Sequence, residues 1–221
     1  MYKRQASIDA SALNTLNGYT TGNIVATTAT SFTGTVSDLN TLYAAATSSG
    51  NGVSGLGSEA VTVTDSSVSA SDLNTLNTKT DYNITVNATA ISGSLSDVST
   101  LYGAKAANSD ADTDGFTGLG NEAITLTDTG SVAANTLTTI ATANSDGTLD
   151  VSGAATITGT AGQITAAFED STITEASDVA LTVDSSGTAS LTQARTLDGL
   201  TTGVVTATIA ATDLSLSLIH I

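Results

Sequence analysis

Short stretches in which β-branched apolar residues alternate with polar ones recur along the whole chain. This alternation is typical of a strand that buries one face, because successive side chains of a strand point to opposite sides. We therefore expect strands at 61–63, 84–86, 124–126, 149–151 and 181–183. A single apolar residue often follows each stretch after about five or six residues, at Val68, Ile91, Val132 and Ile157.

Helix-start signals precede the next apolar clusters. A Ser or Thr followed three residues later by an acid or Gln can satisfy the free amides of a first helical turn. Such pairs are Thr35/Asp38, Ser69/Asp72, Ser94/Asp97 and Thr160/Gln163. Apolar residues then return every three or four positions, which predicts a buried stripe on helices of two to three turns. The stripes are Leu39/Leu42/Tyr43, Leu73/Leu76, Val98/Leu101/Tyr102, Leu137/Ile140 and Ile164/Ala167/Phe168.

The chain repeats itself at a spacing of about 60 residues, and each long repeat divides into two shorter units of roughly 23 to 26 residues. Repeats of this length cannot bury a core alone, but stacked units can. The matching segments are 55–65 with 118–128, 37–43 with 96–102, and 12–17 with 72–77.

These patterns predict an α/β repeat solenoid over residues 6–215. About seven to eight strand–helix units would place parallel strands on one side and short capped helices on the other, stacked over about 35–40 Å. Insertions near 44–58 and 103–121 interrupt the spacing and should bulge from one edge. The alternative is an all-β helix in which the Leu-x-x-Leu segments form further strands.

The two ends of the chain encode one DNA string on opposite strands. Residues 216–221 can be written with codons whose reverse complement encodes Tyr2-Lys3-Arg4-Gln5, preceded by a GTG start. This string looks like the transposase end used to build sequencing libraries, as expected in a metagenomic fragment. We therefore expect residues 1–5 and 216–221 to be sequencing-adapter artefacts, outside the fold.

Composition narrows the possible functions. The formal net charge is −16, and without Lys3 and Arg4 three basic residues face 21 acidic ones, a net charge of −18. A charge of this sign repels nucleic acid and anionic lipid surfaces. No apolar run approaches the roughly 20 residues that span a bilayer. We expect no nucleic-acid partner and no membrane insertion.

Three phrases resemble repeat arrays of very large exported, adhesin-like or calcium-binding surface proteins of marine bacteria, especially cyanobacteria. They are Ser-Asp-Leu-Asn-Thr-Leu (37–42), Gly-Leu-Gly-Asn-Glu-Ala-Ile-Thr-Leu-Thr-Asp (118–128) and Leu-Asp-Gly-Leu-Thr-Thr-Gly (197–203). The resemblance implies an extracellular or cell-surface location and a structural or adhesive role. Its implied partners are neighbouring repeats of the same parent chain and a surface glycan or other extracellular ligand.

One loop has the pattern of a metal site. Asp110, Asp112 and Asp114 alternate before Gly115, and carboxylates spaced in this way suit Ca²⁺. An EF-type loop would place its bidentate Glu at position 121, whereas Glu122 lies one residue later. Calcium is thus the one cofactor that the sequence suggests, with Asp110, Asp112, Asp114 and Glu122 as ligands. The plainer interpretation is a solvated acidic loop.

Paired threonines suggest a second binding hypothesis. Thr62 and Thr64, Thr125 and Thr127, and Thr85 alternate with the apolar residues of expected strands, so their hydroxyls should face outward. A threonine ladder of this kind can bind an ordered surface such as ice, a mineral or polysaccharide. The plainer interpretation is that threonine is favoured on the solvent face of a strand.

Catalytic machinery is sparse. Residues 6–215 contain no His and no Cys, and only two Lys. Nucleophilic catalysis needs an activated nucleophile beside a base. Most carboxylates are expected at helix caps or strand ends, as for Asp38, Asp72 and Asp97. We expect a structural or adhesive scaffold that is not an enzyme, with a calcium-stabilised binding module or a threonine-ladder binder as alternatives.

Overall fold

The computed structural model describes residues 7–47, 50–107, 115–184 and 187–210. Within these residues the chain is a mixed α/β protein with parallel strands and seven helices. It divides into two compact units, Met1–Ala123 and Ile124–Ile221. The segments assigned to sequencing adapters, 1–5 and 216–221, lie outside the described residues.

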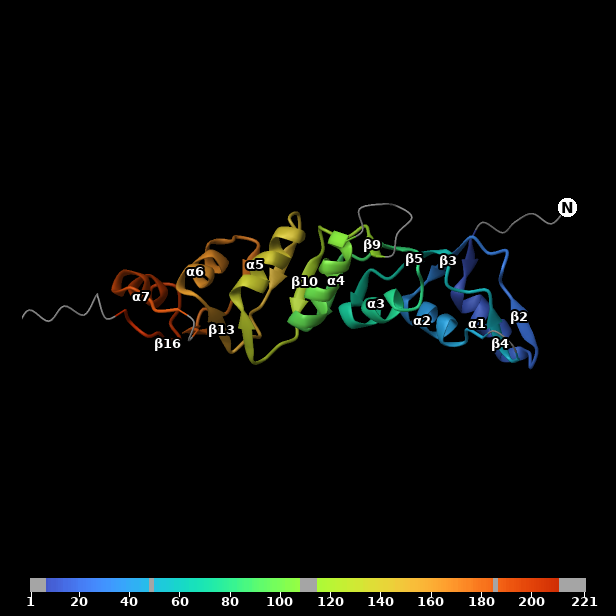
Figure 1. Cartoon of the computed structure of the whole chain (residues 1–221), viewed down its shortest axis with the longest axis horizontal. Helices are drawn as coiled ribbons and strands as arrows, with labels where there is room; N and C mark the ends of the chain where they lie inside the picture. Colours follow the sequence, from blue (N-terminus) through green and yellow to red (C-terminus); the bar gives the residue numbers. More distant parts are fainter. Residues whose placement is uncertain (1–6, 48–49, 108–114, 185–186, 211–221) are drawn as a thin grey trace, which may run out of the picture. The chain divides into compact units, whose positions relative to one another are not determined.

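The first unit alternates short strands with four helices (Figure 1). A parallel sheet runs in the order β1-β3-β5-β7-β9, while β6 pairs with β8 and β2 pairs with β4. Its elements are β1 (Ile8–Asp9), α1 (Ala10–Tyr19), β2 (Asn23–Val25), β3 (Ser31–Gly34), α2 (Val36–Ala44), β4 (Gly52–Ser54), β5 (Ala60–Val63), β6 (Ser67–Ser69), α3 (Ala70–Asn77), β7 (Asn83–Val86), β8 (Ala90–Gly93), α4 (Leu95–Ala107) and β9 (Gly115–Thr117).

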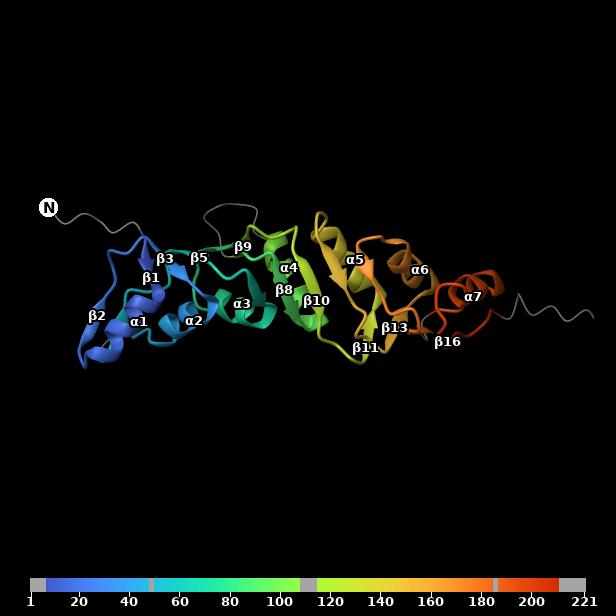
Figure 2. The same cartoon turned by 180° about the vertical axis from the view of Figure 1, so that it is seen from behind.

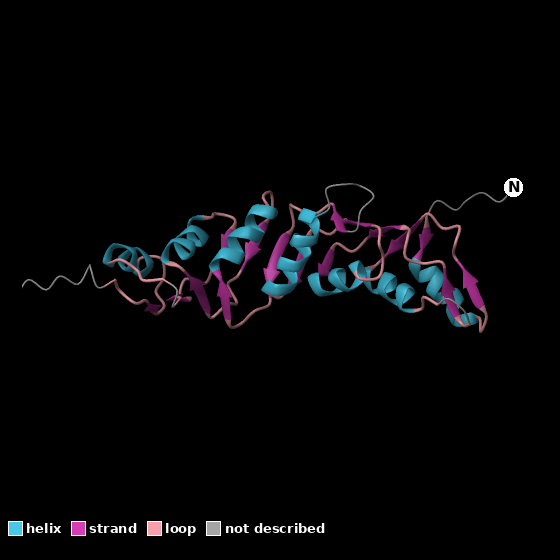
Figure 3. Ribbon diagram, in the orientation of Figure 1, coloured by secondary structure: helices cyan, strands magenta, loops and turns pink. Residues whose placement is uncertain are grey.

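The core of this unit is a column of apolar side chains that the strand register stacks. Phe32 pairs with Val61, Val61 with Ile84, and Ile84 with Phe116, and each side chain is at most 1% exposed. In the first unit, the helices lie along one side of the core and the strands of this sheet along the other (Figure 3). The apolar stripes predicted for these helices are buried, as at Leu39, which is fully buried. Burial of such apolar area is the main force that orders short, individually marginal helices.

Successive helices of the first unit are linked by one recurrent hydrogen bond. The side-chain amide of Asn14 donates to the backbone carbonyl of Asp38 at 2.9 Å, and Asn40 and Asn74 repeat the bond to Asp72 and Asp97. Each acceptor lies in the first turn of the next helix. We call these three bonds the asparagine links. They tie each helix to its successor.

A second link runs from the segment between β5 and β6 back to an earlier helix. The carboxylate of Asp65 accepts the backbone amide of Val36 at 2.7 Å, at the first residue of α2. A negative charge at this point also suits the positive end of the helix dipole. The start of α2 is therefore completed by a residue that lies about one repeat unit later in the sequence.

The second unit contains the remaining elements, and its helices lie across from its strands when seen from behind (Figure 2). One sheet has the strand order β11-β13-β15-β16. The strands β14, β12 and β10 are neighbours, in that order, in a different sheet. The elements are β10 (Ala123–Leu126), β11 (Ser131–Ala133), α5 (Ala134–Ala143), β12 (Thr148–Asp150), β13 (Thr156–Gly159), α6 (Ala161–Glu169), β14 (Ile173–Thr174), β15 (Ala180–Val183), α7 (Leu191–Asp198) and β16 (Val205–Thr206).

Polar groups in the second unit mostly serve their own helix. Thr160 and Gln163 form a complete capping box, as the sequence predicts, and Ser190 and Gln193 form another that the sequence analysis missed. At the helix position of the asparagine links, the Thr165 hydroxyl donates to the carbonyl of Ala161 in its own helix. This position therefore ties turns within α6 rather than one helix to the next.

The expected strands all form, at β5, β7, β10, β12 and β15. The single apolar residues Val68, Ile91, Val132 and Ile157 are centres of further strands, β6, β8, β11 and β13. Much of the chain is thus built of strand–strand–helix units rather than strand–helix units. A strand of three or four residues with one buried side chain has too little alternation to be recognised.

Two further expectations are corrected. The all-β alternative is wrong, because the Leu-x-x-Leu segments form helices, as in α2 and α3. The expected cap at Ser69 is also wrong: its hydroxyl lies 3.0 Å from that of Ser71 and makes no bond to the helix amides. Within the described residues no helix is both long and apolar enough to cross a membrane.

Candidate functional site

The predicted calcium loop falls largely outside the described residues. Asp110, Asp112 and Asp114 all belong to the segment 108–114, so their role as ligands stays a prediction. Glu122, the fourth predicted ligand, is described. No group of three His, Cys, Asp or Glu side chains that could hold a metal occurs among the residues that the structure covers.

Glu122 is fully buried and surrounded by hydrogen-bond donors. One carboxylate oxygen accepts the hydroxyl of Tyr102 at 2.6 Å and the backbone amide of Gly120 at 2.8 Å. The amide of Asn121 lies 3.2 Å from the same oxygen. A buried carboxylate is costly unless its lone pairs are filled. These donors explain how Glu122 is accommodated, and a bound cation would have to compete with them.

Glycine geometry creates the amide cluster around Glu122. Gly118 has a φ of 84°, in the left-handed region that glycine adopts without steric cost. A Cβ at this position would collide with the backbone carbonyl oxygen of Val86. The sequence Gly-Leu-Gly-Asn therefore turns tightly against β7 and points its amides at the carboxylate that follows it.

The sister repeat builds the same turn with a less complete network. Glu59 is 4% exposed and accepts the amides of Gly57 at 2.8 Å and Ser58 at 3.1 Å. The corresponding phenol, Tyr43, is buried, but its hydroxyl has no hydrogen-bond partner within the described chain. Burial raises the pKa of the Tyr43 phenol most strongly, the Glu59 charge raises it further, and the Thr80 hydroxyl lowers it by less.

Each Tyr–Glu pair lies at the base of an insertion. Tyr43 precedes the insertion near 44–58 and Glu59 follows it, while Tyr102 and Glu122 stand in the same relation to 103–121. Burial, the hydrogen bond to Glu122 and the Glu122 charge all raise the pKa of Tyr102, so the phenol stays protonated. The Tyr102–Glu122 pair thus joins the two ends of an insertion, which is a structural role.

The threonine hypothesis gains a specific geometry. Strand register places Thr33 beside Thr62, Thr62 beside Thr85, and Thr85 beside Thr117. All four are partly exposed, and the hydroxyls of Thr85 and Thr117 lie 3.3 Å apart. We call these four residues the threonine column. They form a regular row of hydroxyls and methyl groups on one face of the first unit's sheet.

The grouping of threonines expected from the sequence is partly wrong. Thr62 and Thr85 lie in one sheet, but Thr125 lies in β10, which does not belong to the β1-β3-β5-β7-β9 sheet. The match between 55–65 and 118–128 suggests equivalent places, yet the two strands join different sheets. Thr33 and Thr117 complete the column instead. The alternation of apolar and polar residues around each of them is too short to predict a strand from the sequence.

Glu175 has the most perturbed carboxyl pKa among the described acids. Burial, with a smaller contribution from the Asp170 charge, raises its pKa to about 7. One of its oxygens is buried without a hydrogen-bond partner. A carboxyl of this pKa can act as a general base, but a base needs a nucleophile or substrate cleft beside it, and none of the cavities described is lined by Glu175.

Sequence reasoning missed the asparagine links and the Tyr–Glu pairs. The signal for the links was present, because Leu-Asn-Thr-Leu occurs at 13–16, 39–42 and 73–76. Comparison with models of known protein families, with curated proteins and with solved structures found no match to this chain in any of the three. The inference of function therefore rests on the geometry described above.

Proposed function

We propose that the chain is a non-catalytic structural scaffold, a solenoid in which successive coils stack, from a large bacterial cell-surface or secreted protein. Such a segment extends or displays other parts of its parent protein, as in adhesin-like surface proteins. Its mechanism is the stacking itself, because each coil buries the apolar face of its neighbour. The acidic exterior keeps the array soluble.

One observation carries this proposal: the same parts recur in register from coil to coil. The interior column from Phe32 to Phe116 and the asparagine links both connect each coil of the first unit to the next. These polar links hold elements together rather than lining a cavity. This use of the same contacts in successive coils of the first unit supports a mechanical role over a catalytic one.

A thermal melt of the chain followed by far-UV circular dichroism tests the proposal. We expect a mixed helix–strand spectrum and cooperative unfolding that is the same in excess EDTA and in millimolar Ca²⁺. A coil spectrum under both conditions would rule out the scaffold. Stabilisation by Ca²⁺ that disappears in Asp112→Ala would instead favour the calcium-stabilised binding module, in which Asp110, Asp112 and Asp114 are the ligands.

A second candidate function is favoured by the threonine column. Hydroxyls and methyl groups repeated at the strand spacing of about 4.8 Å offer a periodic surface to a crystalline or polymeric ligand. The ligand class would be ice or an extracellular polysaccharide. The scaffold and the column are compatible, since the column occupies the outer face of the sheet while stacking uses the inner face.

Double substitution within the column tests this second function. Thr62→Val with Thr85→Val keeps side-chain volume and strand propensity but removes two adjacent hydroxyls. We expect it to lower retention on ice or insoluble polysaccharide, measured by co-sedimentation, at least tenfold. Thr125→Val, outside that sheet, is the matched control and should have no effect. Equal retention of all three proteins, or none by the parent chain, would exclude the column as a binding surface.

A further inference from the structure

Two Asn-Gly pairs occur in the chain, and they lie in different local structures. Asn17-Gly18 lies inside α1, whereas Asn51-Gly52 lies in the first insertion, where Asn51 is exposed and Gly52 begins β4. Asparagine is a chemically labile residue, and a following glycine makes it more so, because no side chain shields the next amide nitrogen. Since the two pairs share one chemistry, the local structure decides which of them reacts.

The reaction is an attack within the chain. The backbone nitrogen of Gly52 adds to Cγ of Asn51 and loses its proton, the Cγ–Nδ2 bond breaks, and Nδ2 leaves as ammonia. The product is a five-membered succinimide ring, and water then opens one of its two carbonyls. One opening gives aspartate. The other gives isoaspartate, in which the main chain runs through the side-chain carbons.

The backbone around Asn51 is anchored on one side. After it, Val53 fixes β4 to the end of α2: its amide donates to the carbonyl of Ala45 and its carbonyl accepts the amide of Thr47, both at 2.9 Å. Asn51 itself belongs to no helix or strand, and the one neighbour of β4 among the described strands is β2. The end of an outer strand opens locally at little cost, so the side chain of Asn51 can turn onto the next amide.

The fold requires the glycine of this pair. Gly52 has a φ of 142°, and a Cβ at this position would lie 2.6 Å from the carbonyl oxygen of Ala45. A larger residue would slow the attack on the asparagine, but it does not fit here without strain. The reactive pair is therefore a consequence of how β4 packs against the end of α2.

Helix α1 protects the other pair. In an α-helix each amide donates to the carbonyl four residues earlier, which holds the nitrogen away from the preceding side chain. The side-chain oxygen of Asn17 is also buried. Attack at Asn17 therefore requires the last turn of α1 to unwind first.

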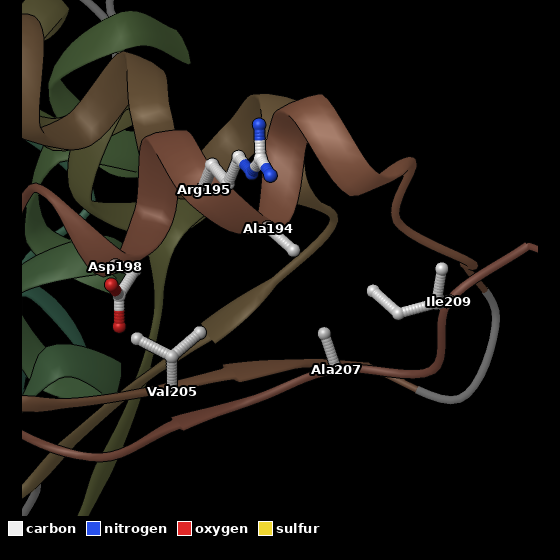
Figure 4. A pocket seen from close by; sticks show the side chains of 6 residues that line it. All are labelled: Ala194, Arg195, Asp198, Val205, Ala207 and Ile209. Carbon is white, nitrogen blue, oxygen red and sulfur yellow. The ribbon is translucent and has the colours of Figure 1, made fainter. Parts of the chain in front are cut away.

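Helix α7 shows this kind of protection in its hydrogen bonds. Asp198 is the last residue of α7 and precedes Gly199 (Figure 4), and an Asp-Gly pair can close the same ring with loss of water. The amide of Gly199, however, donates to the carbonyls of Arg195 at 3.2 Å and Thr196 at 3.1 Å. A nitrogen held in this way is not available for attack, so pairs at helix ends should react slowly.

The second insertion indicates which product the fold accepts. Strand register pairs Gly52 with Asn23 in the first insertion and Gly115 with Asn83 in the second, so the two glycines occupy equivalent places. The sequence has Asp114 immediately before Gly115. The reactive amide of the first insertion thus stands where the sister repeat carries the aspartate that deamidation would produce.

We propose that Asn51 is a site of spontaneous deamidation, through which the chain gains negative charge in its first insertion as it ages. Aspartate at position 51 leaves the fold intact. Isoaspartate adds one main-chain atom directly before β4 and displaces Gly52 from its close contact with Ala45. The population of chains therefore divides with time into an intact form and a form that is loosened at the first insertion. This inference does not depend on the scaffold function.

Peptide mapping by mass spectrometry tests the proposal. The whole chain is incubated at pH 8, once folded and once in concentrated guanidinium chloride, and deamidation is followed at each asparagine. In the folded chain Asn51 should react at least fivefold faster than Asn17, whereas in denaturant the two should react at similar rates. A folded chain in which Asn51 reacts no faster than Asn17 would overturn the proposal.

Substitutions separate the site from its consequence. Asn51→Gln would have to close a six-membered ring, which forms far more slowly, so this variant should lose the fast phase of ammonia release. Asn17→Gln is the matched control and should keep that phase. Survival of the fast phase in Asn51→Gln, or its loss in Asn17→Gln, would also overturn the proposal.

Asn51→Asp tests the fate of the products. This variant should melt at the same temperature as fresh parent chain and resist protease equally. Aged parent chain, which also contains isoaspartate, should be cut faster within the first insertion. A lower melting temperature in Asn51→Asp, or unchanged proteolysis of the aged chain, would contradict the assigned products.

Discussion

The two units follow one sequence grammar but satisfy their polar groups differently. In the first unit, the asparagine links reach from one helix to the next, and the buried Tyr102–Glu122 pair joins the two ends of an insertion. In the second unit, the caps and the threonine of α6 serve their own helix, and the carboxyl of Glu175 keeps a buried oxygen without a partner among the described residues. The comparison teaches that stacking by apolar columns is common to both units, whereas among the described residues side-chain links from one helix to the next are found in the first unit. The second unit links its repeats through threonines outside its helices, such as Thr158, whose hydroxyl donates to the carbonyl of Val132.

The largest effect on stability is expected from removing Glu122, the carboxylate with the most hydrogen-bond donors around it. Glu122→Ala leaves a buried phenol and two backbone amides without their acceptor, and should lower the free energy of unfolding by about 3 kcal/mol. Glu59→Ala frees only the amides of Gly57 and Ser58, and should cost about half as much. Urea denaturation followed by circular dichroism measures both. Equal costs would show that the Tyr102 hydroxyl adds nothing.

The two tyrosines isolate the value of that hydroxyl. Tyr102→Phe removes a hydrogen bond to a buried carboxylate and should destabilise the chain by about 2 kcal/mol. Tyr43→Phe removes a hydroxyl with no partner in the described chain, and should leave stability unchanged or raise it slightly. The same denaturation experiment reports both values, and a loss in Tyr43→Phe as large as that in Tyr102→Phe would contradict the assigned networks.

Glu175 should make the stability of the second unit depend on pH, because its buried carboxyl lacks the hydrogen-bond donors that surround Glu122. The folded state raises the pKa of this carboxyl from 4.5 to about 7. The folded chain therefore holds a proton that the unfolded chain releases, and stability falls as pH rises through this interval. Glu175→Gln should remove this loss and stabilise the chain at pH 8 by about 1.5 kcal/mol, after allowance for partial exposure.

Thermal melts of both proteins at pH 5 and pH 8 measure this effect. The variant should gain on the parent chain only at the higher pH. A gain of the same size at pH 5 would mean that the substitution improves packing, and that the charge of Glu175 is not the cause.

The smallest expected effect on stability comes from one helix position, which is Asn74 in α3 of the first unit and Thr165 in α6 of the second. Asn74→Ala loses a bond of about 1 kcal/mol to the carbonyl of Asp97, partly offset by the better helix propensity of alanine, for a net cost of about 0.5 kcal/mol. Thr165→Ala loses only a bond within its helix and should stabilise by about 0.5 kcal/mol. The two changes should therefore have opposite signs in urea denaturation, and a shared sign would remove the distinction between the units.

The sequence predicts the mixed α/β class, the helix stripes and the five longer strands because each rests on periodicity within a few residues. The shorter strands, such as the one centred on Val68, escape this test because they bury a single side chain. The acidic caps differ in detail: Asp38 accepts the hydroxyl of Thr35 at 2.7 Å, whereas Glu or Gln would reach the backbone amide.

The candidate site is harder to predict because it depends on contacts between segments that lie far apart in the sequence. Spacing along the chain groups Glu122 with Asp110, Asp112 and Asp114. Its donors come partly from Tyr102, at the far side of an insertion whose path the sequence does not specify. Likewise, strand register alone decides that Thr33 and Thr117 join Thr62 while Thr125 does not.

The cap that Asp65 provides to α2 has a consequence for the order in which the chain folds during synthesis. During synthesis, α2 leaves the ribosome about thirty residues before Asp65, and α1 precedes its acceptor at Asp38 by a similar interval. The start of α2 and the asparagine links of α1, α2 and α3 are therefore complete only after the following repeat unit has been made. We expect folding to proceed from the N-terminus, one repeat unit after another. The Asp65 cap and the asparagine links each close a short loop, which keeps the entropic cost of each step low.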